Sequence, residues 1–130
     1  METTFTVYAT VLGKPRPRFS DGRCYTPKKF VDYEREIAKE YLRAGGKKTA
    51  NPVEVEIFIF RELPKSRKKS INSEVDIFKP DIDNIIKIIL DGLNGVAYVD
   101  DTQVISVKAT KADRQRDLKE GIKVKIKERI

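Results

Sequence analysis

The sequence contains no histidine and only one cysteine, Cys24. Without histidine, the chain cannot form a Ser-His-Asp triad, an HExxH zinc protease site or a histidine-based metal nuclease site. A lone cysteine excludes an internal disulfide and any zinc site built from several cysteines. A general acid, a general base or a metal ligand must therefore come mainly from Asp, Glu, Lys, Tyr or the backbone. Oxygen ligands of this kind favour Mg²⁺ or Mn²⁺ over zinc.

Long apolar runs are also missing. No stretch approaches the roughly 18 apolar residues that span a bilayer, and residues 1–10 alternate apolar and polar without the apolar core of a secretory signal. We therefore expect no membrane partner and a cytoplasmic location. The length of 130 residues predicts a single domain over residues 1–130.

Positive charge is abundant, with 27 Lys and Arg against 20 Asp and Glu and a formal net charge of +7. A balance of this sign points to a polyanionic partner, although a merely basic surface is the ordinary alternative. Much of the charge lies in the Gly- and Pro-rich loop 13–23 and in the long segment 63–79. The residues predicted to contact phosphates are Arg16, Arg18, Lys65, Arg67, Lys68 and Lys69.

The apolar pattern predicts six elements. Strands are expected where apolar and polar residues alternate: 4–11, 53–60, 103–110 and 122–127. Helices are expected at about 26–44, with Thr26 as N-cap and Pro27 as first helical residue, and at 81–93. We expect the last two strands to form a hairpin. The order β-α-β-α-β-β predicts an α+β domain with two helices packed on one face of a four-stranded mixed sheet.

Some apolar side chains have no obvious partner within one chain. Ile88 lies outside the apolar stripe of the second helix, and Phe58 and Phe60 share a strand face with glutamates. Either the long loop of the same chain or a second subunit must cover them. Four aromatic residues are candidates for stacking on exposed bases, although such residues more often pack in the core. They are Tyr8, Phe19, Tyr25 and Tyr98.

Aspartates stand on both sides of the second predicted helix. Asp81 and Asp83 precede its apolar residues, and Asp100-Asp101 precede the third strand. Each has an ordinary explanation. Asp81 fits an N-cap, Asp83 fits a first-turn carboxylate that the helix dipole favours and that forms an i,i+4 pair with Lys87, and Asp100-Asp101 fit a polar turn.

Taken together, these aspartates predict a metal site. We expect the start of this helix and the start of the next strand to meet at one end of the sheet. Carboxylates ~4 Å apart repel each other by about 1 kcal/mol in water and ~4 kcal/mol at an effective dielectric of about 20. A divalent cation removes that cost and makes the cluster reactive.

Four motifs of this sequence resemble those of the RusA-type Holliday-junction resolvases. They are D-x-D-N-x-x-K at 81–87, D-D-x-x-V at 100–104, GKPRPRF at 13–19 and YTPKK at 25–29. The resemblance implies a homodimer that cuts four-way DNA junctions symmetrically with Mg²⁺ (or Mn²⁺). It also implies that Asp81, Asp83 and Asp101 are the catalytic, metal-binding acids and that Lys87 is their basic partner. The stretch between the acidic motifs is slightly shorter than in the family, which leaves Asp100 as the alternative to Asp101.

The expected chemistry is metal-assisted hydrolysis of a DNA phosphodiester, with basic residues on the flanking phosphates. Two alternatives remain open. The first is a non-catalytic nucleic-acid-binding module whose aspartates are caps and turn residues. The second is a metal-dependent nuclease that acts on another DNA structure, such as a flap.

Overall fold

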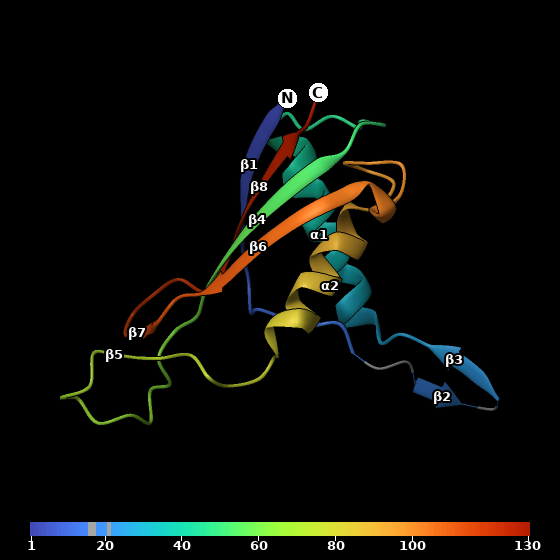
Figure 1. Ribbon diagram of the computed structural model, residues 1–130. Helices are drawn as coiled ribbons and strands as arrows, with labels where there is room; N and C mark the ends of the chain where they lie inside the picture. The colour runs from blue at the N-terminus through green and yellow to red at the C-terminus, as the bar shows by residue number, and fades with distance from the viewer. Residues whose placement is uncertain (16–17, 21) are drawn as a thin grey trace.

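The computed structural model in Figure 1 describes residues 1–15, 18–20 and 22–130. Its main elements, in chain order, are β1 (Glu2–Tyr8), α1 (Lys28–Arg43), β4 (Val53–Phe60), α2 (Ile82–Leu93), the 3₁₀ helix η1 (Asp101–Gln103), β6 (Val104–Lys111) and β8 (Gly121–Glu128). Two short strand pairs accompany them: β2 (Arg18–Ser20) with β3 (Arg23–Tyr25), and β5 (Ser73–Glu74) with β7 (Arg114–Gln115).

The main sheet has four strands in the order β1-β8-β4-β6, and β4 pairs parallel to β6 while the other pairs are antiparallel. Both helices cover the same face of this sheet (Figure 1). Successive side chains of a strand point to opposite faces of the sheet, so every second residue of β4 points into the core. These residues, each at most 3% exposed, are Val53, Val55, Ile57 and Ile59. The predicted α+β fold, a four-stranded mixed sheet with two helices on one face, is confirmed.

The helices bury the residues that recur at three- and four-residue spacing. Those of α1 are Phe30, Tyr33, Ile37 and Tyr41, and those of α2 include Ile85, Ile88 and Ile89. Ile88 is fully buried in the core, where α1 packs against α2, so the chain itself covers it. The N-cap of α1 is Pro27 rather than Thr26. No helix among the described residues combines the length and apolar character needed to cross a membrane.

The predicted hairpin between the last two strands is wrong. β8 lies between β1 and β4, and β6 is an edge strand that pairs with β4 alone. Burial explains the difference: Ile122, Val124 and Ile126 of β8 are fully buried, as a central strand requires, whereas Ile105 and Val107 of β6 remain 48% and 37% exposed. The two strands are adjacent along the chain but not in the sheet.

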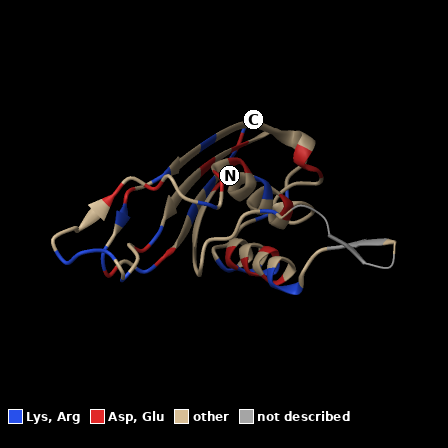
Figure 2. Ribbon diagram, turned by 90° about the horizontal axis from the view of Figure 1, so that it is seen from below, with Lys and Arg blue, Asp and Glu red and all other residues tan. Residues whose placement is uncertain are grey.

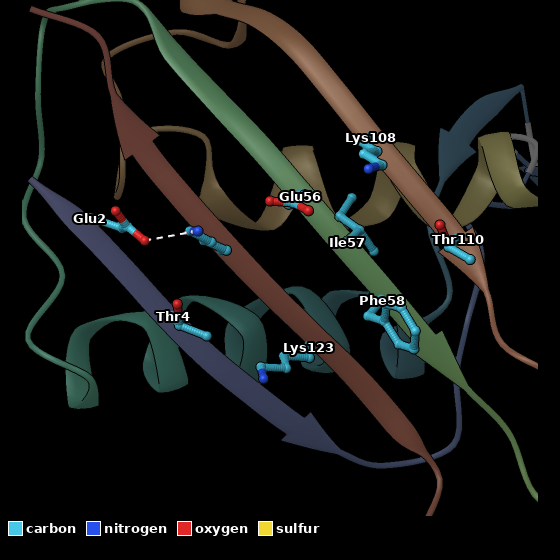
Figure 3. Close-up of a pocket in the computed structure, with 9 residues that line it drawn as sticks. Glu2, Thr4, Glu56, Ile57, Phe58, Lys108, Thr110 and Lys123 are labelled. Carbon is cyan, nitrogen blue, oxygen red and sulfur yellow. Dashed lines mark ion pairs between the residues drawn. The ribbon is translucent and has the colours of Figure 1, made fainter.

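No helix of the described residues covers the second face of the sheet. A pocket on this face is lined by residues including Glu56, Phe58, Lys108 and Lys123 (Figure 3). Charges of opposite sign alternate across it, and Lys125 Nζ lies 2.9 Å from a carboxylate oxygen of Glu2. The face is therefore a mixed polar surface and not a strongly basic one. Phe58 stays 51% exposed there.

Residues 61–80 and 112–120 together form an arm that projects from one end of the sheet (Figure 1). The β5–β7 pair joins its two segments, and the Leu63 amide donates to the Gln115 carbonyl at 2.8 Å. Arg116 donates to the carbonyls of Lys68 and Ile71 at 2.8 and 2.6 Å. The sequence pattern of residues 63–79 predicted no helix or strand. Hydrogen bonds to residues 112–120, which are distant along the chain, hold this segment in place.

Candidate active site

Asp81 and Asp83 lie at the start of α2 with their carboxylates exposed. Asp81 occupies the N-cap position, but its side chain makes no capping hydrogen bond. Within residues 1–15, 18–20 and 22–130, Asp83 has neither an ion pair nor a side-chain hydrogen bond. Neither a capping hydrogen bond nor an Asp83–Lys87 pair is therefore formed among the described residues, and of the ordinary explanations only the helix dipole, which favours carboxylates at this end of α2, still applies.

A buried ion cluster holds the residues just before Asp81. The side chain of Asp76 is fully buried, and its Oδ1 lies 3.3 Å from Arg61 Nη1 and 3.7 Å from Lys111 Nζ. Arg61 also donates to the Lys79 carbonyl at 2.9 Å, and Lys111 donates to the Pro80 carbonyl at 3.2 Å. Sequence analysis missed this cluster; its only sequence signal is a single aspartate within the apolar stretch VDIF.

The loop that begins at Gly13 docks on the same end of α2. A Cβ at Gly13 would lie 2.8 Å from the Pro80 Cβ and 3.0 Å from the Asn84 Cβ, so only glycine fits without displacement. The Lys14 amide donates to the Asn84 carbonyl at 2.8 Å. A pocket lies between this loop and Asp81. The GKPRPRF and D-x-D-N motifs therefore meet in space, although they are far apart in sequence.

Replacing Gly13 with Ala is expected to displace this loop and to destabilise the protein by about 1–3 kcal/mol, the usual cost of overpacking. Junction binding should weaken more than the fold does, because the basic loop follows Gly13 directly. Thermal denaturation and a gel-shift titration measure the two effects. Gly45→Ala is the matched control outside the basic loop, because a Cβ there meets no atom within 4 Å, although its φ of 87° adds a strain of its own. Full binding by Gly13→Ala would show that the close packing does not position the loop.

Lys14 and Lys87 share one carboxylate on α2. Lys14 Nζ lies 3.1 Å from both Glu34 and Asp91, and Lys87 Nζ lies 3.2 Å from Asp91. Burial alone lowers the pKa of Lys14, but hydrogen bonds to Glu34 and Asp91 outweigh it and raise that pKa. Lys14 is therefore a fixed cation that ties the loop to both helices. The side chain of Lys87 is 61% exposed and is free to contact a ligand.

Asp100 and Asp101 have different environments. Asp100 caps η1: it accepts from Thr102 Oγ1 at 2.7 Å and from the Thr102 amide at 3.4 Å, and these bonds lower the pKa of Asp100. The side chain of Asp101 makes no such bond within the described part of the chain. This difference favours Asp101 as the acid that stays available for a ligand.

Tyr98 is fully buried beside Asp101 and donates to the Leu90 carbonyl at 2.6 Å. Burial raises the pKa of Tyr98, and the nearby carboxylates of Asp101, Asp91 and Asp100 raise it further. Tyr98 cannot stack on a base, so its predicted alternative role in core packing is the correct one. Tyr8 is 57% exposed, packs edge-on against Phe60 and has Lys119 over its ring.

The two pairs of aspartates lie at opposite ends of α2. The helix has 12 residues, a length of about 18 Å at ~1.5 Å per residue. The expectation that the start of this helix meets the start of the next strand is therefore wrong within one chain. The reason is the connection: α2 links two parallel strands and must run back antiparallel to both, so its start lies at the far end of β6. The Lys111–Pro80 hydrogen bond marks that contact.

A divalent cation therefore has only part of its predicted ligand set in one place. Asp81 and Asp83 are hard oxygen donors of the type that Mg²⁺ prefers. Asp101 lies at the other end of the helix, and no group of three acidic or thiol side chains in the described residues is arranged to hold a metal ion. The three predicted ligands do not form a complete site in a single subunit.

The basic residues predicted to contact DNA belong to two segments of the chain, the loop 13–23 and the arm. Arg16 lies outside the described residues, and so does the side chain of Arg18. On the arm, Lys65, Lys68 and Lys69 are exposed, and Figure 2 shows basic residues along its loop. Arg67 is different: its Nε lies 3.1 Å from Glu74, and its guanidinium packs over the Phe78 ring. Arg67 therefore has a structural role in the arm.

A basic α+β domain with free carboxylates at a helix start, beside projecting basic loops, has the arrangement of a nuclease that cleaves phosphodiesters. The family model described as Endodeoxyribonuclease RusA matches residues 9–127, and the chain therefore belongs to the RusA family of endodeoxyribonucleases. Its class of activity is that of the Holliday-junction resolvase nucleases, which act on DNA. The chain is also similar to YqaN of Bacillus subtilis (strain 168), an uncharacterized protein. The two are 31% identical over 122 residues, which cover 82% of this chain and 84% of YqaN.

Proposed function

We propose that this protein resolves Holliday junctions by paired symmetric nicks, as a homodimer that depends on Mg²⁺ (or Mn²⁺). The proposal rests on the exposure of the Asp81 and Asp83 carboxylates. Both carboxylates stand exposed at a helix start, and among the described residues neither serves as a cap or an ion-pair partner. The helix dipole favours carboxylates at this end of α2, but no capping bond or ion pair uses them, and ligand binding would.

In the proposed site, Asp81 and Asp83 would hold the cation, and Lys87 would contact the scissile phosphate. Asp101 lies a helix length away within one chain, so it would reach this cation only from the second subunit of the homodimer. A bound divalent cation lowers the pKa of water and offsets the negative charge that develops on phosphorus. The positive N-terminal end of α2 adds to the attraction for the phosphate. Lys87 lies one turn from Asp83 on the exposed side of the helix, so its ammonium can approach a phosphate held there.

The basic loop and the arm are proposed to hold the DNA on either side of this site. Gly13 and Lys14 fix the start of the loop beside Asp81. Arg16 and Arg18, which follow in this loop, are proposed to contact flanking phosphates. Lys65, Lys68 and Lys69 lie on the exposed loop of the arm. Phosphate contacts of this kind position a duplex without reading its sequence.

Incubation with a mobile four-way junction and Mg²⁺ tests the proposal. The expected products are paired nicks at symmetric positions in opposing strands, and none should form in EDTA. Flap, single-stranded and linear duplex substrates serve as controls. Faster cleavage of a flap would assign another DNA substrate, and binding without cleavage in any metal would make the protein a non-catalytic binding module.

Replacing Lys87 with Ala is expected to lower the nicking rate by at least about a hundredfold, as the loss of a group that stabilises transition-state charge does. The melting temperature should change little, because the Lys87–Asp91 pair is exposed and such pairs contribute about 0.3–0.5 kcal/mol. Single-turnover nicking and thermal denaturation give the two numbers, and Lys48→Ala is the control at another exposed lysine. Full activity with a lower melting temperature would leave Lys87 only a salt-bridge role.

The double replacement Arg16→Ala and Arg18→Ala is expected to weaken junction binding and to flatten its salt dependence. Each lost phosphate contact lowers the slope of log K against log salt by about 0.9 for duplex DNA. Gel-shift titrations over a salt series measure this slope. Lys47→Ala with Lys48→Ala removes the same charge from a different surface and should leave the slope closer to that of the wild type. An unchanged slope for the arginine variant would place the loop away from DNA.

A further inference from the structure

The segment that joins the arm to the start of α2, residues 75–80, reverses the usual distribution of side chains (Figure 1). Its acidic residue, Asp76, is buried, whereas the apolar residues on either side of it, Val75 and Ile77, are 64% and 81% exposed. Among the described residues, only the C-terminal Ile130 exposes more of a large apolar side chain than Ile77 does. One exposed apolar residue is ordinary, but two around a buried charge require an explanation.

Hydrogen bonds and ion pairs on both sides of Ile77 hold it in this exposed position. Asp76 Oδ1 accepts from the Phe78 amide at 3.4 Å, which places Ile77 at the apex of a tight turn. The same oxygen lies beside Arg61 and Lys111, and Lys111 also donates to the Phe78 carbonyl at 2.6 Å. The Ile77 side chain therefore cannot turn into the core unless the buried ion cluster breaks.

Phe78 forms a packed base next to this turn. The guanidinium carbons of Arg67 and Arg114 lie 5.6 and 4.8 Å from the centre of its ring. Cations at this distance from an aromatic ring are attracted to it. Phe78 is therefore engaged within the arm, and Ile77 is the side chain that projects from it.

The charges of this part of the chain fit a polyanion. Residues 61–80 contain six Lys or Arg and three Asp or Glu. Every charged side chain among them that is exposed is a lysine: Lys65, Lys68, Lys69 and Lys79. Interfaces between proteins are depleted in lysine, whereas DNA phosphates attract it. An apolar tip on a lysine-rich segment therefore matches DNA, which has phosphates on the outside and apolar base faces within.

Ile77 also lies close to the proposed site. It precedes Asp81 by four residues, so the two Cα atoms are at most about 14 Å apart. Successive phosphates of one strand are about 3.4 Å apart along the duplex axis. Ile77 can therefore reach a base step within about four nucleotides of a phosphate held at Asp81.

Accepting the proposed function, we infer that Ile77 is a wedge that enters between bases at the crossover of a four-way junction. Apolar side chains that insert at a base step unstack it and kink the duplex. Unstacking costs most within a continuous duplex and least where the bases are already disturbed, as they are at a crossover. Ile77 thereby makes the protein select junctions over linear duplex, and it is a specificity-determining residue rather than a catalytic one.

Other exposed apolar side chains lack this combination of features. Phe58 shares the uncovered sheet face with Glu2 and Glu56, whose charges repel phosphates. Leu42 is 56% exposed near the end of α1, and none of the predicted site residues lies on that helix. Leu42 therefore provides the matched control for a change at Ile77.

The fluorescence of 2-aminopurine beside the crossover tests the inference, because this base analogue emits more strongly when it is unstacked. A four-way junction with a fixed crossover carries the analogue at each flanking position in turn, and Ca²⁺ replaces Mg²⁺ so that binding is measured without cutting. Saturating wild-type protein should raise the fluorescence at one or more positions. Ile77→Ala should lose most of that rise, Ile77→Leu should restore it, and Leu42→Ala should match the wild type.

Gel-shift titrations measure the contribution of Ile77 to selectivity. Ile77→Ala should weaken junction binding about tenfold, as the loss of a buried apolar contact does, and should leave the binding of linear duplex unchanged. Mismatched bases beside the crossover should restore much of the lost affinity, because bases that are already unpaired need no wedge. A misfolded variant would instead bind both DNAs poorly and gain nothing from the mismatches.

The outcomes separate this inference from the proposed function. If the wild type nicks junctions while Ile77→Ala keeps the full fluorescence rise and junction affinity, the wedge is overturned and the resolvase function stands. A lower mass of Ile77→Ala in sedimentation equilibrium, with equal loss of binding to both DNAs, would make Ile77 a contact between copies of the chain and also overturn the wedge. Unstacking that depends on Ile77 in a protein that never cuts would support the wedge and refute the function.

Discussion

Asp83→Asn is expected to abolish nicking of a four-way junction, by at least about a hundredfold, while junction binding stays intact or becomes tighter. The carboxylate is exposed and has no hydrogen bond or ion pair within the described chain, so its loss removes a ligand without removing a structural contact. It also removes a negative charge that repels DNA phosphates. Single-turnover nicking and a gel-shift titration in Ca²⁺ measure cutting and binding separately.

Asp113→Asn is the matched control for this substitution. Asp113 is also exposed, and it is not part of the proposed site. It should keep wild-type nicking and show the size of the general charge effect on binding. Equal loss of binding and cutting in Asp83→Asn, with a lower melting temperature, would mean that Asp83 supports the fold and not the chemistry.

Asp76→Ala is expected to cause the largest loss of stability, about 3–5 kcal/mol, because it leaves buried cations without their partner. The side chain of Asp76 is fully buried between Arg61 and Lys111, and those cations hold the backbone of residues 78–80. Chemical denaturation should show the lower stability. Nicking at a temperature where the variant is still folded should also fall, since Asp81 follows this segment directly.

Two further variants separate charge from packing at this position. Asp76→Asn keeps the size of the side chain and removes its charge, so an intermediate loss is expected. Asp113→Ala removes an exposed aspartate and should change stability by less than about 0.5 kcal/mol. A stability of Asp76→Ala equal to that of the wild type would show that Arg61 and Lys111 find other partners, and the cluster would then not be what positions Asp81.

The position of Asp76 also shows why the site was only partly predictable. The motif around Asp81 is compact in sequence, and its residues lie together because one helix carries them. The groups that orient it come from far away in the chain: Arg61 from the arm, Lys111 from the end of β6, and Gly13 from the first loop. Such long-range contacts leave no periodic signal in the sequence.

Local patterns in the sequence determined the element types and the chemistry that is available. Alternation over 53–60 and three- to four-residue spacing over 82–93 depend only on backbone geometry, and the structure has strand and helix there. The absence of histidine left Asp, Glu, Lys, Tyr and the backbone to supply metal ligands and acid/base groups, and the D-x-D-N-x-x-K run resembles the family to which the chain belongs.

Tertiary structure alone decided which elements are neighbours. β8 lies between β1 and β4, where a neighbouring strand on either side helps to bury its apolar residues completely. β6 is therefore left at an edge of the sheet. Tertiary structure also buried Ile88 within the core, where α1 packs against α2. It also placed Asp101 a helix length away from Asp81, since a connection between parallel strands must reverse direction. Strand order and chain direction depend on pairing between distant segments, which no local pattern encodes.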